Sequence, residues 1–231
     1  MKLYPIEAVG LEVETALHSL PQEQFPVREV KDDGSIHSSS DSEAWEVVSE
    51  PLTGFKQVRD FWEIIKKHYD VKGINDSMGF HIHTSYSEIS DYVVIYSKDF
   101  YTKFLQAVKE KFLGEGWIEK RFHNGYCSAY HSSDLFDSRR TLSSYDKRYH
   151  AVNYRAITDH KTIEFRVFPS ATVERMDRYL KFTVRFIKKY LQGKKIRERE
   201  ELTFSDILGG EEEVLELPLF KPKKEGVVIH V

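Results

Sequence analysis

The sequence has a single cysteine, Cys127, and no long apolar run among its 231 residues. One cysteine cannot form an intrachain disulfide and gives no support to a thiolate zinc site. The formal net charge is only −3, which offers no electrostatic basis for bulk binding to nucleic acid or to a membrane. No stretch approaches the roughly 20 apolar residues of a membrane-spanning helix. These absences favour a cytoplasmic protein that binds neither nucleic acid nor membrane.

The chain also lacks internal repeats and any Gly/Ser-rich linker that would divide it. Its 40% hydrophobic and 31% charged residues are typical of a globular protein with a substantial core. We therefore expect one domain over residues 1–231, with the acidic residues 200–231 as a C-terminal extension.

The spacing of apolar residues predicts an α+β order of strands and helices. Alternation predicts strands at 8–16, 44–49 and 79–85, a further short strand at 92–96, and a hairpin of 151–155 with 162–168. Helical spacing predicts helices at 55–69, 97–112 and 171–192, the second capped by Ser97. Polar stretches at 31–43 and 114–148 are expected to be loops, and 226–231 could add an edge strand.

Ionisable residues recur at even spacing on the predicted strands, and even spacing places residues on one face of a strand. These residues are Glu12 with Glu14, Glu46 with Glu50, His81 with His83, and Glu164 with Arg166. The intervening residues are apolar and would pack on the other face: Leu11, Val13, Val47, Phe80, Ile82, Ile163 and Phe165. Each set alone has an ordinary explanation, such as a solvated sheet face or a cross-strand salt bridge. Their joint occurrence favours a shared site.

Carboxylates that converge on one surface raise one another's pKa or require a cation. Hard oxygen ligands with an imidazole suit Mg²⁺ or Mn²⁺ better than zinc. The pattern therefore favours a magnesium-type centre. A hydrolytic metal site built on His81 and His83 remains an alternative.

Five segments, GLEVET, DGSI, EVVSEPL, GFHIHTS and TIEFRVFPS, occur in this order between residues 8 and 170. Together they resemble the amidoligases, which belong to the glutamine synthetase and glutamate–cysteine ligase superfamily. The resemblance implies one catalytic domain with an antiparallel sheet curved into a half-funnel and helices on its convex face. ATP would enter at one end, and the acceptor substrates would meet at the other.

The resemblance also implies two or more metal ions, with residues assigned to each. The ligands of the metal that bridges the nucleotide phosphates would be Glu12, His81 and Glu164. Glu14 would hold the metal nearer to the substrate carboxylate. Glu46 and Glu50 would supply the rest, and the resemblance does not choose between them.

Other residues match nucleotide- and phosphate-binding positions of the superfamily. His83 and Ser85 correspond to contacts with the nucleotide. Arg166 corresponds to an arginine that stabilises the transferred phosphate. Arg155 and Arg148 occupy the arginine-bearing stretch that precedes this strand.

The activity that the resemblance implies is ATP-dependent joining of a carboxylate to an amine through an acyl phosphate. Glu50 or Asp33 could accept the proton that the amine loses. The substrates would be a small-molecule or peptide acid and an amine, and the oligomeric state stays open. An alternative of another class is a catalytically silent relative that binds a nucleotide or a partner protein.

Overall fold

A six-stranded antiparallel sheet forms the centre of the protein. The computed structural model describes residues 5–115, 118–123, 125, 127 and 149–194. The strands follow the spatial order β2-β3-β1-β4-β6-β5, so the sheet is open, with β2 and β5 at its edges. Their bounds are β1 Ile6–Leu17, β2 Val27–Lys31, β3 Glu43–Ser49, β4 Gly79–Tyr86, β5 Val152–Asn153 and β6 Ile163–Pro169. The mixed class and the antiparallel sheet are confirmed, and the half-funnel shape stays a prediction.

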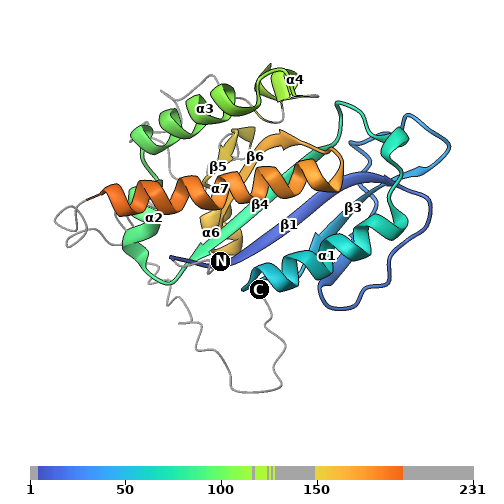
Figure 1. Cartoon of the computed structure of the whole chain (residues 1–231), viewed down its shortest axis with the longest axis horizontal. Coiled ribbons are helices and arrows are strands. Elements are labelled where there is room, and N and C mark those ends of the chain that lie inside the picture. Colours follow the sequence, from blue (N-terminus) through green and yellow to red (C-terminus); the bar gives the residue numbers. More distant parts are fainter. Residues whose placement is uncertain (1–4, 116–117, 124, 126, 128–148, 195–231) are drawn as a thin grey trace.

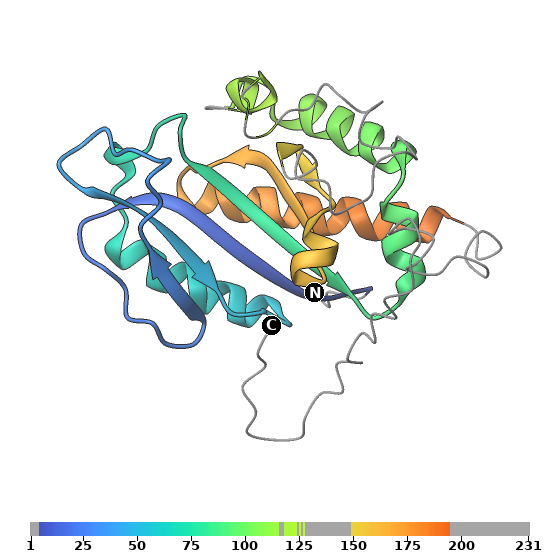
Figure 2. The ribbon, with the colours of Figure 1, turned by 180° about the vertical axis from the view of Figure 1, so that it is seen from behind.

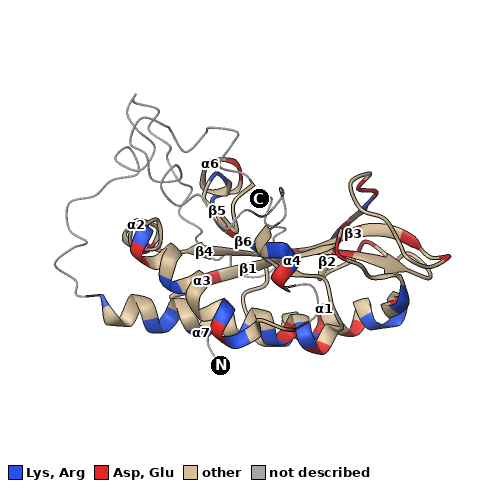
Figure 3. Cartoon of the chain, turned by 90° about the horizontal axis from the view of Figure 1, so that it is seen from above, with Lys and Arg blue, Asp and Glu red and all other residues tan. Residues whose placement is uncertain are grey.

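Two helices, α1 (Phe55–His68) and α7 (Val173–Gly193), cover one face of this sheet. Figures 1 and 3 show both helices along that face. Figure 2 shows the opposite face, where the strands lie in front of these helices. The other helices in the described part of the chain are α2 Ile89–Ile95, α3 Lys98–Phe112, α4 Ile118–His123 and α6 Ala156–His160, with a 3-10 turn, η1, at Val71–Gly73. No helix among the described residues has both the length and the apolar character needed to cross a membrane.

The helix-covered face of the sheet carries the apolar half of each alternating strand. Leu11 and Val13 of β1, and Phe80 and Ile82 of β4, are completely buried in the main core. Helix α7 completes this core with one apolar stripe, which runs from Val173 through Met176, Leu180, Val184 and Ile187 to Leu191. Burying each such side chain contributes about 1.5–3 kcal/mol relative to exposure. Packing on this face therefore stabilises the sheet and leaves the other face for polar groups.

Aromatic rings fix strand β6 against α3 and α7. The ring centroid of Phe104 lies 4.9 Å from that of Phe165 on β6 and 5.4 Å from that of Phe186 on α7. Phe165 is completely buried, and its two flanking residues, Glu164 and Arg166, point to the other face. The aromatic core thus holds these two ionisable residues in position.

Most of the expected elements are confirmed within a few residues of their predicted ends. The Ser97 hydroxyl accepts the Phe100 backbone N–H and caps α3, as its sequence predicts. Strand β2 was not predicted, because its segment lacks a long alternating pattern. The expected strand at 92–96 is wrong, since these residues lie in and after α2. The Tyr92 hydroxyl there donates to the Lys161 carbonyl, a contact with a distant segment that local sequence does not encode.

The remaining expectations concern loops and the C-terminus. Strands β5 and β6 pair as the expected hairpin, but the one-and-a-half-turn helix α6 connects them. Helix α4 lies within the stretch 114–148 that was expected to be a loop. The expected edge strand at 226–231 and the extension at 200–231 lie outside the described residues.

Candidate active site

The face of the sheet opposite to α1 and α7 gathers the ionisable residues of four adjacent strands. The register of β3, β1, β4 and β6 brings side chains from distant parts of the sequence next to one another. Three cross-strand partnerships result: Glu14 with Glu46, Glu12 with His81, and His83 with Glu164. Spacing by two along each strand and antiparallel pairing across strands are together sufficient to build this row.

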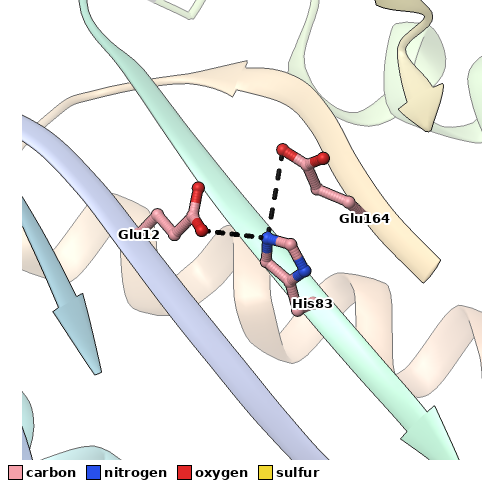
Figure 4. A group of neighbouring side chains, drawn as sticks. All are labelled: Glu12, His83 and Glu164. Carbon is pink, nitrogen blue, oxygen red and sulfur yellow. Dashed lines mark ion pairs between the residues drawn. The ribbon is translucent and has the colours of Figure 1, made fainter. Parts of the chain in front are cut away.

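The first carboxylate cluster consists of Glu12, His83 and Glu164, shown in Figure 4. One ligand atom from each of the three lies within 4.8 Å of the others. His83 Nε2 is 3.3 Å from Glu12 Oε1 and 4.0 Å from Glu164 Oε1. On the other side of the ring, His83 Nδ1 lies 2.9 Å from Thr162 Oγ1. This hydrogen bond orients the ring so that Nε2 faces both carboxylates.

His81 joins the first cluster to a second one. Its Nδ1 lies 3.2 Å from Glu12 Oε2 and 3.3 Å from Glu164 Oε1. Its Nε2 lies 3.5 Å from Glu14 Oε1 on the other side. The Nε2 atoms of His81 and His83 are both buried without a hydrogen-bond partner among the described residues. Each imidazole therefore presents a nitrogen that could bind a further group.

The second carboxylate cluster consists of Glu14, Asp33 and Glu46, whose ligand atoms also lie within 4.8 Å of one another. Glu14 accepts the backbone N–H of Gly79, and Asp33 accepts both the N–H and the hydroxyl of Ser35. Lys31 places its Nζ 2.9 Å from Glu46 Oε1. Three carboxylates face one ammonium group here, so negative charge is in excess.

The structure brings Glu46 into the second cluster but not Glu50. Glu50 follows the end of β3 and is half-buried, and its backbone N–H donates to the Pro26 carbonyl. Sequence spacing placed both on one face, but the strand ends between them. Of the two candidate ligands, only Glu46 is positioned with Glu14.

Glu164 is the most fully neutralised carboxylate of the row. Its Oε1 accepts Arg166 Nη1 at 2.6 Å, and its Oε2 accepts Asn153 Nδ2 at 2.5 Å. Asn153 lies opposite Glu164 in the β5–β6 pairing. Sequence reasoning missed Asn153, Thr162 and Lys31, since each is a common polar residue whose role depends on its cross-strand neighbour.

Other residues proposed from the sequence lie apart from the two clusters. Arg155 directs its Nε to Asp159 on α6, at 3.0 Å. The Ser85 hydroxyl accepts the Ala8 backbone N–H at 3.2 Å, further along β4. Arg148 lies outside the described residues. Their assignment to nucleotide binding stays a prediction.

Burial and neighbouring charges perturb the site unevenly. Burial disfavours the ionised form of Glu12, but the charges of His83 and His81 and the hydrogen bond with His81 outweigh it and hold the Glu12 pKa well below its usual value. Burial likewise opposes ionisation of Glu164, yet Arg166 and the two imidazoles lower its pKa. Burial and the charge of Glu12 together raise the pKa of Glu46, against the opposing effect of Lys31. The first cluster is thus compensated internally, and the second is not.

The donor set fits a hard divalent cation. Carboxylate oxygens with one or two imidazole nitrogens are typical ligands of Mg²⁺ or Mn²⁺. The first cluster could hold one ion through Glu12, Glu164 and an imidazole. The second could hold another through Glu14, Glu46 and Asp33, whose excess negative charge a cation would neutralise.

A family model described as "Putative amidoligase enzyme" matches residues 7–134. This match covers more than half of the chain and includes β1 to β4, with Glu12, Glu14, Glu46 and His81. Glu164 and Arg166 lie beyond the matched region, on β6, but on the same face of the sheet. No curated protein and no solved structure matches the chain. On the strength of the family match, the chain belongs to the amidoligase family.

Proposed function

We propose that the protein is an ATP- and Mg²⁺-dependent ligase that joins a carboxylate to an amine through an acyl phosphate. The observation that carries this proposal is the pair of adjacent carboxylate clusters joined by His81. Phosphoryl transfer asks a protein mainly for positioning and for neutralisation of phosphate charge. Two neighbouring cation sites on a rigid sheet meet both requirements.

The residues that would hold metal divide between the clusters. Glu12, Glu164 and the imidazole of His81 or His83 would bind one ion, and Glu14 with Glu46 the other. Bound magnesium would neutralise the nucleotide and acyl phosphates. Lys31 is 43% exposed at its side chain, so it can leave Glu46 for solvent at little cost when a divalent ion takes its place.

The chain's own groups would act on the phosphate and on the amine. Arg166 is largely buried and paired through Nη1 with Glu164, and its Nε has no hydrogen-bond partner among the described residues. That Nε could donate to a phosphate oxygen as negative charge shifts during transfer. Asp33 is held ionised by Ser35, since these hydrogen bonds lower its pKa despite partial burial. Asp33 lies within the second cluster, which favours it over Glu50 as the acceptor of the amine proton.

The reaction balances in two displacements. A carboxylate oxygen of the acid substrate attacks the γ-phosphorus of ATP, and ADP leaves. The amine nitrogen then attacks the acyl carbon, inorganic phosphate leaves with that oxygen, and the amine proton passes to a carboxylate. Each turnover therefore consumes one ATP and forms one amide.

The test uses the full chain with Mg²⁺-ATP and a panel of acids and amines, and measures ADP, phosphate and amide. We expect ADP and phosphate only when an acid and an amine are both present. With an acid labelled by ¹⁸O in its carboxylate, one labelled oxygen should appear in the phosphate. Glu12→Gln and Glu164→Gln should abolish turnover, whereas Glu63→Gln on α1, an exposed control, should retain it.

Three outcomes would contradict the proposal. Turnover that persists in both Glu12→Gln and Glu164→Gln would exclude the carboxylate row as the active site. Tightly bound zinc with ATP-independent hydrolysis would favour the metal-hydrolase alternative instead. Binding of ATP without turnover across the whole panel would favour a catalytically silent relative.

A further inference from the structure

A second buried arginine, Arg121 of α4, reaches the site from outside the sheet. Helix α4 packs against β6, and the Arg121 side chain is almost completely buried, with 2% of its surface exposed. Its Nη2 donates to the backbone carbonyl of Arg166 at 3.0 Å. Its Nε has no hydrogen-bond partner, and no acidic side chain in the described part of the chain forms an ion pair with it.

Gly79, the first residue of β4, leaves the space that the Arg121 side chain occupies. A Cβ added there would lie 2.5 Å from Arg121 Nη2 and 2.8 Å from His81 Nε2, closer than real Cβ contacts. The backbone N–H of Gly79 donates to Glu14 of the second carboxylate cluster. Arg121, His81 and Glu14 therefore meet around this glycine, at the beginning of β4.

The Arg121 guanidinium is buried, its Nε has no hydrogen-bond partner, and no carboxylate among the described residues pairs with its charge, so the arrangement is energetically incomplete. Arginine stays charged in proteins and carries five N–H donors in a planar fork. Taking that charge out of water is costly unless an anion faces it. Arg166, whose carbonyl Arg121 contacts, also has an unpartnered Nε. Two buried arginines thus offer unused donors beside the carboxylate row.

We propose that Arg121 and Arg166 form an oxyanion subsite at the Gly79 end of the second carboxylate cluster. Its ligand would be a carboxylate or a phosphate, both of which present paired oxygens to a guanidinium fork. This inference rests on the proposed function, in which the acid substrate enters as a carboxylate and leaves its oxygen in phosphate. Arg121 would bind the oxyanion beside the magnesium sites, and Gly79 would leave room for Arg121.

The alternative is that Arg121 only anchors α4 to β6. An anchor would affect stability but not the affinity for small anions. The experiment measures binding of inorganic phosphate and of acetate separately by calorimetry, with Mg²⁺ and ADP present. The variants are Arg121→Gln, Arg121→Lys and Gly79→Ala, with Arg178→Gln as control, since Arg178 is an exposed arginine paired with Glu115.

We expect Arg121→Gln to weaken anion binding by about 10- to 100-fold, the effect of losing one charge-assisted interaction. Arg121→Lys keeps the charge but loses the planar fork, and should be intermediate. Gly79→Ala should weaken binding although both arginines remain, because the new methyl group displaces Arg121. If only the affinity for phosphate falls, the subsite binds the phosphoryl group. If only the affinity for acetate falls, it binds the carboxylate of the acid substrate.

The subsite is refuted if wild-type protein binds neither anion, or if Arg121→Gln binds both as wild type does while unfolding at a lower temperature. Where turnover is measurable, Arg121→Gln should raise the KM for the acid more than it lowers kcat. An unchanged KM in an active ligase would overturn the subsite but not the proposed function. If anion binding depends on Arg121 but the protein has no ligase activity, the subsite is supported and the proposed function is not.

Discussion

Replacing Glu12 and Glu46 separately by glutamine should change the stability of the metal-free protein in opposite directions, although both are candidate metal ligands. Glu12 is the compensated carboxylate, with His81 Nδ1 at 3.2 Å and His83 Nε2 at 3.3 Å. Glu46 is the less compensated one, because burial and the charge of Glu12 raise its pKa more than Lys31 and His81 lower it. Glutamine keeps the shape of either side chain and removes the charge.

The magnitudes follow from these contacts. An amide can replace one of the two acceptor oxygens of Glu12, so Glu12→Gln loses about one hydrogen bond to a charged group, or about 2 kcal/mol. The carboxylates of the second cluster lie within 4.8 Å of one another, and two charges at that distance repel by about 3 kcal/mol at an effective dielectric constant of about 20. The ion pair between Lys31 and Glu46 is partly exposed, so its attraction offsets only about 1 kcal/mol or less of this repulsion. Glu46→Gln should therefore stabilise the metal-free protein by about 1–2 kcal/mol.

The assay is thermal unfolding followed by circular dichroism, with EDTA or with millimolar Mg²⁺. In EDTA at neutral pH, at about 2–4 °C for each kcal/mol, the Tm should fall by about 4–8 °C in Glu12→Gln and rise by about 2–8 °C in Glu46→Gln. Mg²⁺ should raise the Tm of wild type by mass action, and both variants should lose most of that rise. A Glu46→Gln protein less stable than wild type in EDTA would refute the reasoning.

The pH dependence gives an independent check with a definite sign. The folded-state pKa of Glu12 is lowered, so its stabilisation is complete above the unfolded value near 4.5 and is lost as the pH falls through the folded value. The folded-state pKa of Glu46 is raised, so its penalty is absent below that unfolded value and grows as the pH rises through the folded one. The gain in stability from Glu46→Gln should therefore disappear in mildly acidic buffer. The loss of stability from Glu12→Gln should persist to lower pH.

Three further predictions concern the framework of the fold. Phe104→Ala should destabilise the protein by about 3–5 kcal/mol in urea unfolding, because it empties the contact with Phe165, and a loss below about 1 kcal/mol would contradict the packing described. Ser97→Ala should cost about 1 kcal/mol in the same assay, whereas Ser97→Asp should retain the cap of α3. Asp70 accepts hydrogen bonds from the hydroxyls of Ser40 and Ser42, which lower its pKa to about 2. Asp70→Asn should therefore be less stable than wild type at neutral pH, and the difference should vanish as the pH falls from about 4 to 2; a constant difference would show that Asp70 acts only through its shape.

Alternation along the strands made much of the core predictable from the sequence. In β1, Leu11 and Val13 were expected on one face and Glu12 and Glu14 on the other, and this separation is confirmed. The rule works because a strand has a side-chain period of two whatever its neighbours are. It fails where neighbours decide the outcome, as at Tyr92, which lies in a helix although its β-branched surroundings resemble a strand.

The sequence predicted which face of the sheet carries the site better than it predicted which residues are in contact there. Spacing of two fixes which side of a strand a residue occupies, but pairing across strands decides which residues touch. The register of β4 against β6 shifts between Phe80 and Ile82, and it places His83 opposite Glu164. His83 consequently lies with Glu12 and Glu164, and the nucleotide contact that the family resemblance implies for it stays a prediction. Arg121 had no local signal, because its helix lies in a stretch whose composition is typical of a loop.

The division of each strand into an apolar and a polar face has a consequence for how this chain can change over generations. Selection for a folded protein acts mainly on residues such as Leu11 and Phe165, whose replacement opens a cavity in the core. Under the proposed function, their neighbours Glu12 and Glu164 contribute chemistry, and their exchange opens no cavity in the core. A descendant could therefore lose or alter its reaction by one or two substitutions and still be recognised by its hydrophobic pattern. If the proposed function holds, the intact row of ionisable residues, rather than the fold, would distinguish an active enzyme among such relatives.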